Sequence, residues 1–341
     1  MATSAHKAGR KPCRKLETVG RYALLTGALL LAACAARRVA PPSTQEAIRG
    51  IKRVQRDLGF RETGNFVSIK PDQRAFHRCY YAGQFELPDS YEGLRMKDGT
   101  AEGCPPAGPG WDVFFYPIEA VAGANTPVTA ALATTTIERL AVVVSHEDFH
   151  EDPQIQRLPT RIGEAAATLV GFLSAARYAS TQHGPDSDTY RNLSREASLY
   201  RTKARIVNRY HEKIAALYRS LRERKADLHG VAERKRMLFD ALQGECGAIH
   251  PEPTSFHRCL AANNNAGLGF EITYTRYYPL LYELHLALGA DLKKTIAALR
   301  QCGELGPYSE EKTIRGIRGI MMGEPVPPVV TPDTDSQPPV H

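Results

Sequence analysis

The sequence lacks an apolar run long enough to cross a membrane as a helix. The apolar stretch between Ala23 and Ala33 is the most extended near the N-terminus, whereas a spanning helix needs about 20 apolar residues. The chain also has no Cys-x-x-Cys pair, which argues against a structural zinc site built from cysteines. It has no basic stripe interleaved with stacking aromatics, so we expect no nucleic-acid partner.

Residues 1–33 instead have the pattern of a lipoprotein signal peptide. Six Lys or Arg residues precede the apolar stretch, which ends at Leu31-Ala32-Ala33-Cys34, a small-residue cleavage site followed by cysteine. We expect the Cys34 thiol to carry lipid and to begin the mature chain, anchored in a membrane by more than one acyl chain. Because Ala35 is not aspartate, nothing argues for inner-membrane retention. The expected location is the bacterial envelope, at the outer membrane facing the periplasm. The alternative is a plain secretory signal with an incidental cysteine.

Most of the positive net charge of the chain comes from this leader. Residues 1–33 hold six Lys or Arg and one Glu, a net charge of +5, so the formal charge falls from +7 for the whole chain to +2 for the mature part. About 300 residues remain, which is enough to bury an ample core. The charge therefore gives no reason to expect an acidic partner.

The cysteine content agrees with an oxidising compartment. After Cys34 is assigned to lipid, the expected mature chain keeps five cysteines, and disulfides persist in such compartments. Connectivity does not follow from spacing alone, but proximity favours pairs that close short loops and leaves Cys302 free. The disulfide candidates are Cys79 with Cys104 and Cys246 with Cys259.

The organisation of the chain predicts an α+β fold that is mainly α-helical. Residues 34–43 are expected to be a linker, 44–322 a single domain, and 323–341 a Pro-rich disordered tail. Within the domain, 44–135 open with a helix over 44–58 and continue with short strands and loops, including a strand at 113–116. Residues 136–180 carry two apolar helices, and 185–305 are helical. Residues 188–243 form one or two long charged helices whose charges we expect to face solvent, and 291–301 form a further helix.

The strongest chemical signal is an HExxH motif inside an apolar helix. Val142-Val143-Val144-Ser145 precede His146-Glu147-Asp148-Phe149-His150. Helical spacing of four residues places both imidazoles on one face, where they can bind one zinc ion, with Glu147 beside the metal as general base. The apolar residues before the motif are typical of an internal active-site helix, whereas a chance match in a charged surface would have polar neighbours.

A catalytic zinc site needs a third protein ligand, and Glu164 is the best candidate. The HExxHxxGxxH extension is absent, but Glu164 lies fourteen residues after His150 at the start of the next apolar helix. A carboxylate that begins an otherwise Ala-rich buried face needs a partner, and a metal supplies one. The alternative is a first-turn glutamate favoured by the helix dipole. Glu151 is the second candidate, but it points about 100° away from His150 on the same helix.

With these residues the chain resembles a family of bacterial envelope lipoproteins predicted to be zinc aminopeptidases of the gluzincin type. The family's HELAHQ and NExxA segments become HEDFHE and GEAAA here, with Gly163 in place of the usual asparagine. Residues 53–60 and 112–128, and Asn264-Asn265-Ala266-x-Leu268 followed by Tyr274 and Pro279, are similar to further landmarks. The resemblance covers nearly the whole mature chain. It implies a zincin-like metallopeptidase fold, with a small N-terminal strand region and long helices C-terminal to the metal site.

The expected chemistry is amide hydrolysis by a zinc-activated water, with Glu147 as the proton acceptor. The resemblance also points to Tyr274 as a donor to the developing oxyanion, although an aromatic core or surface role is equally compatible with its position. The expected cofactor is one zinc ion and the expected partner a peptide. Two other functions stay open: a zinc endopeptidase, and a non-catalytic envelope lipoprotein that uses the fold as a scaffold. The intact Glu147 argues against the second.

Overall fold

The computed structural model describes residues 43–123, 125–224, 226–259, 261–304 and 309–324. The predicted signal peptide, the lipidation site Cys34 and the Pro-rich tail from residue 325 onward lie outside the described residues. Among the described residues, no helix is both long enough and apolar enough to cross a membrane.

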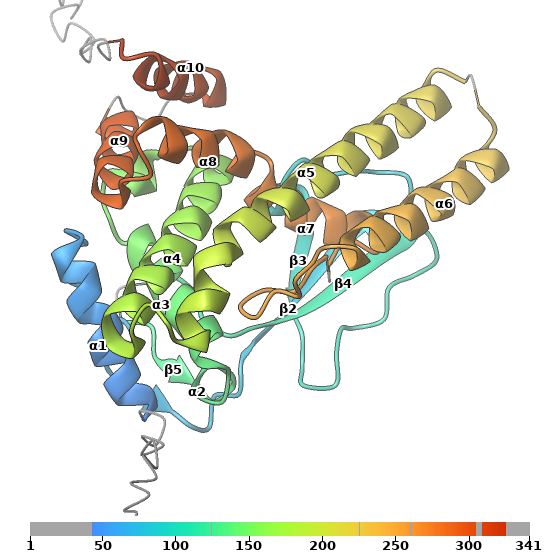
Figure 1. Cartoon of the computed structure of the whole chain (residues 1–341). Coiled ribbons are helices and arrows are strands. Elements are labelled where there is room, and N and C mark those ends of the chain that lie inside the picture. The colour runs from blue at the N-terminus through green and yellow to red at the C-terminus, as the bar shows by residue number, and fades with distance from the viewer. Residues whose placement is uncertain (1–42, 124, 225, 260, 305–308, 325–341) are drawn as a thin grey trace, which may run out of the picture. The chain divides into compact units, whose positions relative to one another are not determined.

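The described part of the chain has an α+β fold that is mainly helical, as the sequence predicts (Figure 1). Short 3-10 turns at Tyr91–Gly93 and Ile155–Arg157 add to its helices and strands. The helices and strands, in chain order, are α1 Thr44–Asp57, β1 Ile69–Lys70, β2 Phe76–Gly83, β3 Arg95–Asp98, β4 Trp111–Ile118, β5 Val128–Thr129, α2 Ala130–Ala133, α3 Ile137–His150, α4 Thr160–His183, α5 Asp188–Arg222, α6 Leu228–Gly247, α7 Asn265–Thr275, α8 Tyr278–Ala287, α9 Leu292–Glu304 and α10 Glu310–Met321.

Two small sheets occupy the region that the sequence predicts as strands and loops. β2 lies between β3 and β4 in an antiparallel sheet of order β3-β2-β4, and β1 pairs with β5 in parallel over two residues. Tyr80 of β2 lies opposite Phe114 of β4, and both rings pack on Phe270 of α7 with centroids 5.1 and 5.3 Å away. The larger sheet is therefore fixed to the helical part through aromatic contacts.

The long helix α4 lies at the centre of the main core. It contacts α1, α3, α5, α7, α8 and α9, and Ala165, Ala166 and Ala167 are fully buried. A helix that is apolar on nearly all sides is stable only inside the protein. α1 covers this core with the stripe predicted from helical spacing, because Ile48, Ile51, Val54 and Leu58 are all buried.

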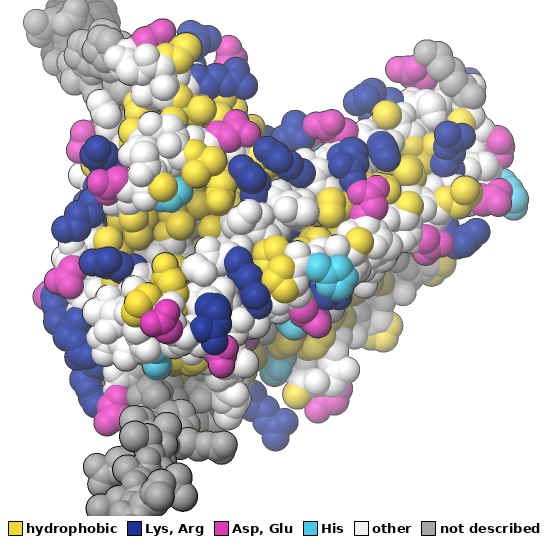
Figure 2. Space-filling model, in the orientation of Figure 1, with side chains coloured by type: hydrophobic (Ala, Val, Ile, Leu, Met, Phe, Trp, Pro, Cys, Tyr) yellow, Lys and Arg dark blue, Asp and Glu magenta, His cyan; other side chains and the backbone are white. Residues whose placement is uncertain are grey.

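The charged stretch forms two antiparallel helices, α5 and α6, which we call the α5–α6 hairpin. Figure 1 shows the two helices side by side, and they share an apolar core that includes Val207, Ile214 and Leu242. Lys, Arg, Asp and Glu side chains are interspersed over its outer surface (Figure 2). The expectation that the charges face solvent is incomplete, however, because Glu196 and Lys203 in the first half of α5 are buried.

Both cysteine pairs favoured by proximity form disulfides. Cys79 of β2 is bonded to Cys104, and Cys246 near the end of α6 is bonded to Cys259. Cys302 is a free, buried thiol whose pKa burial raises to about 11. The second bond fastens the loop between α6 and α7, whose residues reach the candidate site.

Candidate metal centre and active site

Helix α3 presents the HExxH motif from inside the core. Thr136 caps its N-terminus, with the hydroxyl accepting a hydrogen bond from the Arg139 backbone N–H at 3.2 Å. Leu140 to Val144 are buried, so the apolar run fixes the helix before the motif begins. The histidine rings, one helical turn apart, then project from the same face with centroids 4.8 Å apart.

Helix α4 brings Glu164 against this face. The two helices approach closely at Gly171, where an added Cβ would lie 3.2 Å from the Val142 carbonyl oxygen and 3.4 Å from the His146 Cβ. A larger residue at this position would have to push the helices apart. The missing side chain at Gly171 therefore lets α4 approach the backbone of the first histidine.

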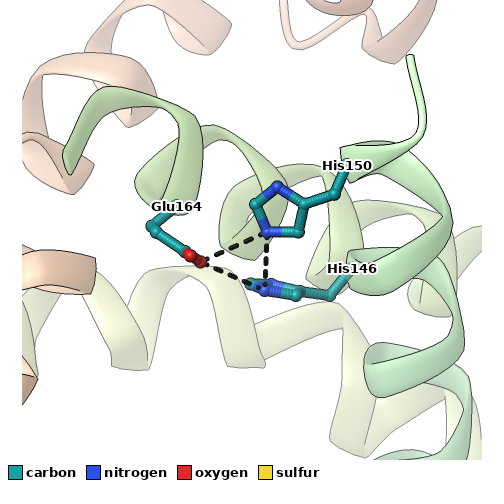
Figure 3. A group of neighbouring side chains, drawn as sticks. All are labelled: His146, His150 and Glu164. Atoms are coloured by element: carbon teal, nitrogen blue, oxygen red, sulfur yellow. Dashed lines mark hydrogen bonds and ion pairs between the residues drawn. The ribbon is translucent and has the colours of Figure 1, made fainter. Parts of the chain in front are cut away.

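The three predicted ligands converge. Figure 3 shows His146 and His150 from α3 and Glu164 from α4 pointing toward one another. The two Nε2 atoms are 3.2 Å apart, and Glu164 Oε2 lies 3.2 Å from Nε2 of His150 and 3.4 Å from Nε2 of His146. Zinc bonds to nitrogen and oxygen are about 2.0–2.2 Å long, so ligand atoms at the corners of a tetrahedron are roughly 3.3–3.6 Å apart. The donor set and its spacing fit one tetrahedral zinc ion with a fourth position left open.

The charges of the cluster agree with an anionic carboxylate between two imidazoles. Burial opposes ionisation of Glu164, but the charges and hydrogen bonds of His150 and His146 hold its pKa well below the usual range. Burial acts against the protonated form of His150, yet Glu164 outweighs it and raises the pKa of that ring. The pKa of Glu147 is raised, chiefly by burial. A cation bound between these groups would take the place of the imidazole protons.

Two side chains support the ligands from behind. The Tyr91 hydroxyl donates a hydrogen bond of 3.0 Å to Glu164 Oε1, which leaves Oε2 to face the histidines. The Thr168 hydroxyl, one turn after Glu164 on α4, lies 3.5 Å from His146 Nδ1. Such outer contacts orient metal ligands. Sequence reasoning missed both, because Tyr91 lies in a short 3-10 turn far from the motif in the chain and no local pattern links the two.

A cavity of about 150 Å³ opens beside the cluster and is lined by His146, Glu147 and Tyr274 among others. Its wall is strongly aromatic. The other aromatic rings that line it are Phe114, Tyr116, Phe172, Tyr200, Phe256 and Phe270. We refer to this space as the aromatic cavity. The predicted general base and the predicted oxyanion donor therefore both line this cavity.

Two ion pairs that sequence reasoning did not find also line the aromatic cavity. Arg139 donates from Nε to Glu119 Oε2 at 2.7 Å, and its Nη1 donates to the Ser255 carbonyl at 2.9 Å. Lys203 lies 3.1 and 2.9 Å from the two carboxylate oxygens of Glu271. Arg139 is two turns before His146 on α3, so helical spacing could have placed it on the motif's face. Lys203 and Glu271 come from distant helices.

Tyr274 on α7 lies close to the cluster. Its ring centroid is 6.3 Å from that of His146 and 6.4 Å from that of Tyr91. Burial raises the pKa of its phenol far above the usual value, and the nearby Glu164 carboxylate adds to the effect. No hydrogen bond from this hydroxyl to another described residue is seen. The structure thus brings Tyr274 to the cavity with a protonated phenol.

Other polar residues near the motif have structural roles. Asp148 is buried and accepts a hydrogen bond from Thr63 at 2.6 Å, while its other oxygen pairs with Lys52 at 2.6 Å. Asn264 caps α7 by accepting from the Gly267 N–H at 2.9 Å. Asp148 therefore does not add a free negative charge to the site.

One comparison with known proteins gives a match. The model of a family described as "Putative aminopeptidase" matches residues 109–314, a span that includes both histidines, Glu147, Glu164 and Tyr274. No curated protein and no solved structure matches the chain.

Proposed function

Because the match covers more than half of its 341 residues, the chain belongs to the putative aminopeptidase family, and we propose that it is a zinc-dependent peptidase with a zincin-like fold. The observation that carries this proposal is the cluster of His146, His150 and Glu164, whose donor atoms have the spacing of a tetrahedral zinc site. Glu147 lies on α3 next to His146, and it lines the aromatic cavity.

The two Nε2 atoms and a carboxylate oxygen of Glu164 would hold one zinc ion. Zinc bound by three protein ligands lowers the pKa of a water molecule and polarises a carbonyl group. Glu147 would accept a proton from the attacking water and later give it to the leaving amine, as the peptide C–N bond breaks and a C–O bond forms. Tyr91 would keep Glu164 in its ligand orientation through the observed hydrogen bond.

Tyr274 is our candidate for the group that stabilises the oxyanion. Its ring is next to His146, and among the described residues its hydroxyl has no competing acceptor. A phenol in this position can donate to charge that develops on the substrate carbonyl oxygen in the transition state. This role would affect the rate of hydrolysis and leave metal binding unchanged.

We further propose aminopeptidase rather than endopeptidase activity. A free substrate ammonium must then meet an anion near the reacting centre, and the aromatic cavity offers Glu119 and Glu271 besides Glu147. Both oxygens of Glu271 face Lys203. Arg139 contacts only Oε2 of Glu119, so Oε1 can accept from a substrate ammonium. Glu119 is the better candidate for this contact.

Peptides with free and with acetylated amino termini test this function. The purified protein loaded with zinc should hydrolyse free dipeptides and aminoacyl amides, and acetylation of the terminus should remove most of the rate. Equal cleavage of both forms would favour the endopeptidase alternative. Absence of hydrolysis of every peptide tested would instead favour a scaffold role and contradict the peptidase proposal.

The envelope location is a separate proposal that rests on the leader sequence. We propose that Cys34 is lipidated and anchors the protein at the outer membrane, where peptides in the periplasm would be its substrates. Cys34→Ser should release the protein from membranes or block its processing. Unchanged membrane fractionation of that variant, together with an unmodified mature terminus, would contradict the anchor.

A further inference from the structure

The aromatic cavity has the construction of a side-chain subsite. Phe172, Tyr200 and Phe256 form a three-ring contact in its wall, with centroid separations of 5.0 to 5.4 Å. Phe114 and Phe270 pack 5.3 Å apart in another part of the wall. Rings packed in this way present carbon surfaces to whatever enters the space, and burying apolar surface against them is favourable.

The two cationic side chains that line the cavity, Arg139 and Lys203, are already paired with carboxylates. The Lys203 ammonium has three N–H donors, and three acceptors lie within hydrogen-bond distance: both oxygens of Glu271 and the His257 carbonyl at 2.9 Å. Arg139 is bound to Glu119 and to a backbone carbonyl. An acidic substrate side chain would therefore find no free cation, and entering the cavity would remove its hydration without replacement.

The loop that carries Phe256 is held in place at several points. The buried carboxylate of Glu196 accepts from the Thr254 N–H at 2.9 Å and from the Ser255 hydroxyl at 2.6 Å. Arg139 from the motif helix binds the Ser255 carbonyl, and the Cys246–Cys259 disulfide closes the loop. The wall is consequently preformed, and its size is a property of the folded protein.

The volume sets the size of the group that fits. The cavity measures about 150 Å³, and a protein cavity of about this volume lined by apolar residues binds benzene. We infer that the aromatic cavity is the specificity subsite for the substrate residue next to the scissile bond, and that it takes an uncharged apolar side chain of the size of phenylalanine or leucine. This inference rests on the proposed peptidase function.

The same dimensions make alanine and tryptophan poor substrate residues. An alanine methyl would leave most of the cavity unfilled and forgo its contacts, whereas an indole exceeds the space that a single benzene ring fills. A basic side chain would lack a free anion once the substrate ammonium occupies Glu119 Oε1 and Glu147 holds the attacking water. The structure thus predicts a preference by size and by charge, which a panel of substrates can separate.

The first experiment compares aminoacyl amide substrates on the purified, zinc-loaded protein. We expect kcat/KM for the Phe and Leu substrates to exceed that for Ala by at least about tenfold, since each methylene in a fitted apolar pocket changes selectivity by roughly 10–200-fold. The kcat/KM values for the Asp, Lys and Trp substrates should be lower than that for the Phe substrate by a similar factor. Equal rates across the panel, or a preference for Asp or Lys, would overturn the inference.

Phe256 provides a variant that resizes the cavity, and Phe85 provides a matched control. Each is a half-buried phenylalanine that packs edge-on against a tyrosine of α5, Phe256 on Tyr200 and Phe85 on Tyr218, but Phe85 does not line the cavity. Phe256→Trp should reduce kcat/KM for the Phe substrate about tenfold while sparing Ala. Phe256→Ala should raise kcat/KM for the Trp substrate relative to kcat/KM for the Phe substrate. Phe85→Ala and Phe85→Trp should keep the wild-type profile.

A binding measurement provides a readout that needs no turnover. In zinc-loaded Glu147→Gln protein, calorimetric titration should show tighter binding of phenylalanine amide than of alanine amide or lysine amide. Equal affinities would contradict the subsite even if the Phe256 variants fail to fold. If the wild type hydrolyses peptides without size preference, the subsite is wrong and the peptidase function stands. If it hydrolyses no peptide at all, both are wrong.

Discussion

The helix pair α3–α4 and the α5–α6 hairpin are both antiparallel, but they bury different things. In α3–α4 a glycine and several alanines bring two apolar helices close together, and the polar groups His146, His150 and Glu164 point inward at one another. In the hairpin an apolar stripe closes the contact and most charges face outward. Removing polar groups from water is costly unless they are partnered. The cluster that points inward therefore indicates a functional role, whereas charges that face solvent need no such explanation.

The first half of α5 lies between these two extremes. Lys203 is buried, whereas the three groups of α3–α4 are partly buried, and its charge is fully satisfied by Glu271 and a carbonyl oxygen. Among the described residues, the three groups at the motif contact one another and two hydroxyl groups, those of Tyr91 and Thr168. A buried ion pair that is complete by itself has a structural role, whereas a cluster of donors that lacks a central cation is suited to bind one.

The largest expected effect of a single change that keeps the metal is at Glu147. Glu147→Gln removes the proton acceptor but leaves all three ligands, so hydrolysis should fall by about a thousandfold or more while zinc content stays the same. The same change at Glu233, an exposed glutamate of the hairpin, should leave both unchanged. Steady-state kinetics with metal analysis on the same samples measures this, and substantial activity in Glu147→Gln would remove the residue from the mechanism.

A smaller loss is expected at Tyr274. Tyr274→Phe removes a hydroxyl that would act only in the transition state, so kcat should fall about a hundredfold with little change in KM or in zinc content. Tyr277→Phe is the control, because its hydroxyl donates to Glu310 at 2.7 Å and does not line the cavity. Full activity per folded Tyr274→Phe molecule would assign this side chain a packing role only.

The disulfide near the base of the hairpin should affect stability more than chemistry. Replacing both Cys246 and Cys259 by serine opens a loop with a sequence separation of 13, which corresponds to about 3 kcal/mol of unfolding free energy in the chain-entropy estimate. Zinc content at 25 °C should be unchanged, because no ligand lies in that loop. Denaturant unfolding measures the first quantity, and loss of zinc from a folded double variant would show that the two regions are coupled.

The smallest expected effects are changes in stability when either of two glycines of α4, Gly163 or Gly171, is replaced by alanine. At Gly163 an added Cβ would meet its nearest atom at 3.8 Å, an ordinary contact, so Gly163→Ala should gain up to about 1 kcal/mol from helix propensity. At Gly171 the same methyl would press on α3 beside His146, and overpacking should lower stability by about 1 kcal/mol and weaken zinc binding. Thermal unfolding and zinc titration of the two variants would show the contrast. Equal behaviour would contradict the close approach at Gly171.

The sequence predicts the parts of the fold and site that depend on local spacing. The helix stripe of Ile48, Ile51 and Val54 and the two apolar helices around the motif follow from periodicity, and the structure has them. The convergence of Glu164 with the histidines could be anticipated because one short connection joins the two helices. Helix α10 and the pairing of β2 between β3 and β4 were not predicted separately, because the register of a sheet depends on contacts between distant segments.

Local patterns also could not predict which residues from distant parts of the chain contact the site. Tyr91 contacts Glu164 across 73 positions of the chain, and Lys203 meets Glu271 across 68. No spacing rule links such residues, since the tertiary fold alone brings them together. The expectation that the charges of α5 face solvent was partly wrong for the same reason: the burial of Glu196 and Lys203 follows from their partners in the loop before α7 and in α7 itself.

Metal analysis of the purified protein is the most direct test of the proposed zinc site. We expect about one zinc ion per chain. The ion should be lost in His146→Ala, His150→Ala and Glu164→Ala and kept in His229→Ala, which changes an exposed histidine of the hairpin. A chain that contains no zinc after gentle purification and takes up none on addition, or a His146→Ala variant that binds as much zinc as the wild type, would contradict the proposed site.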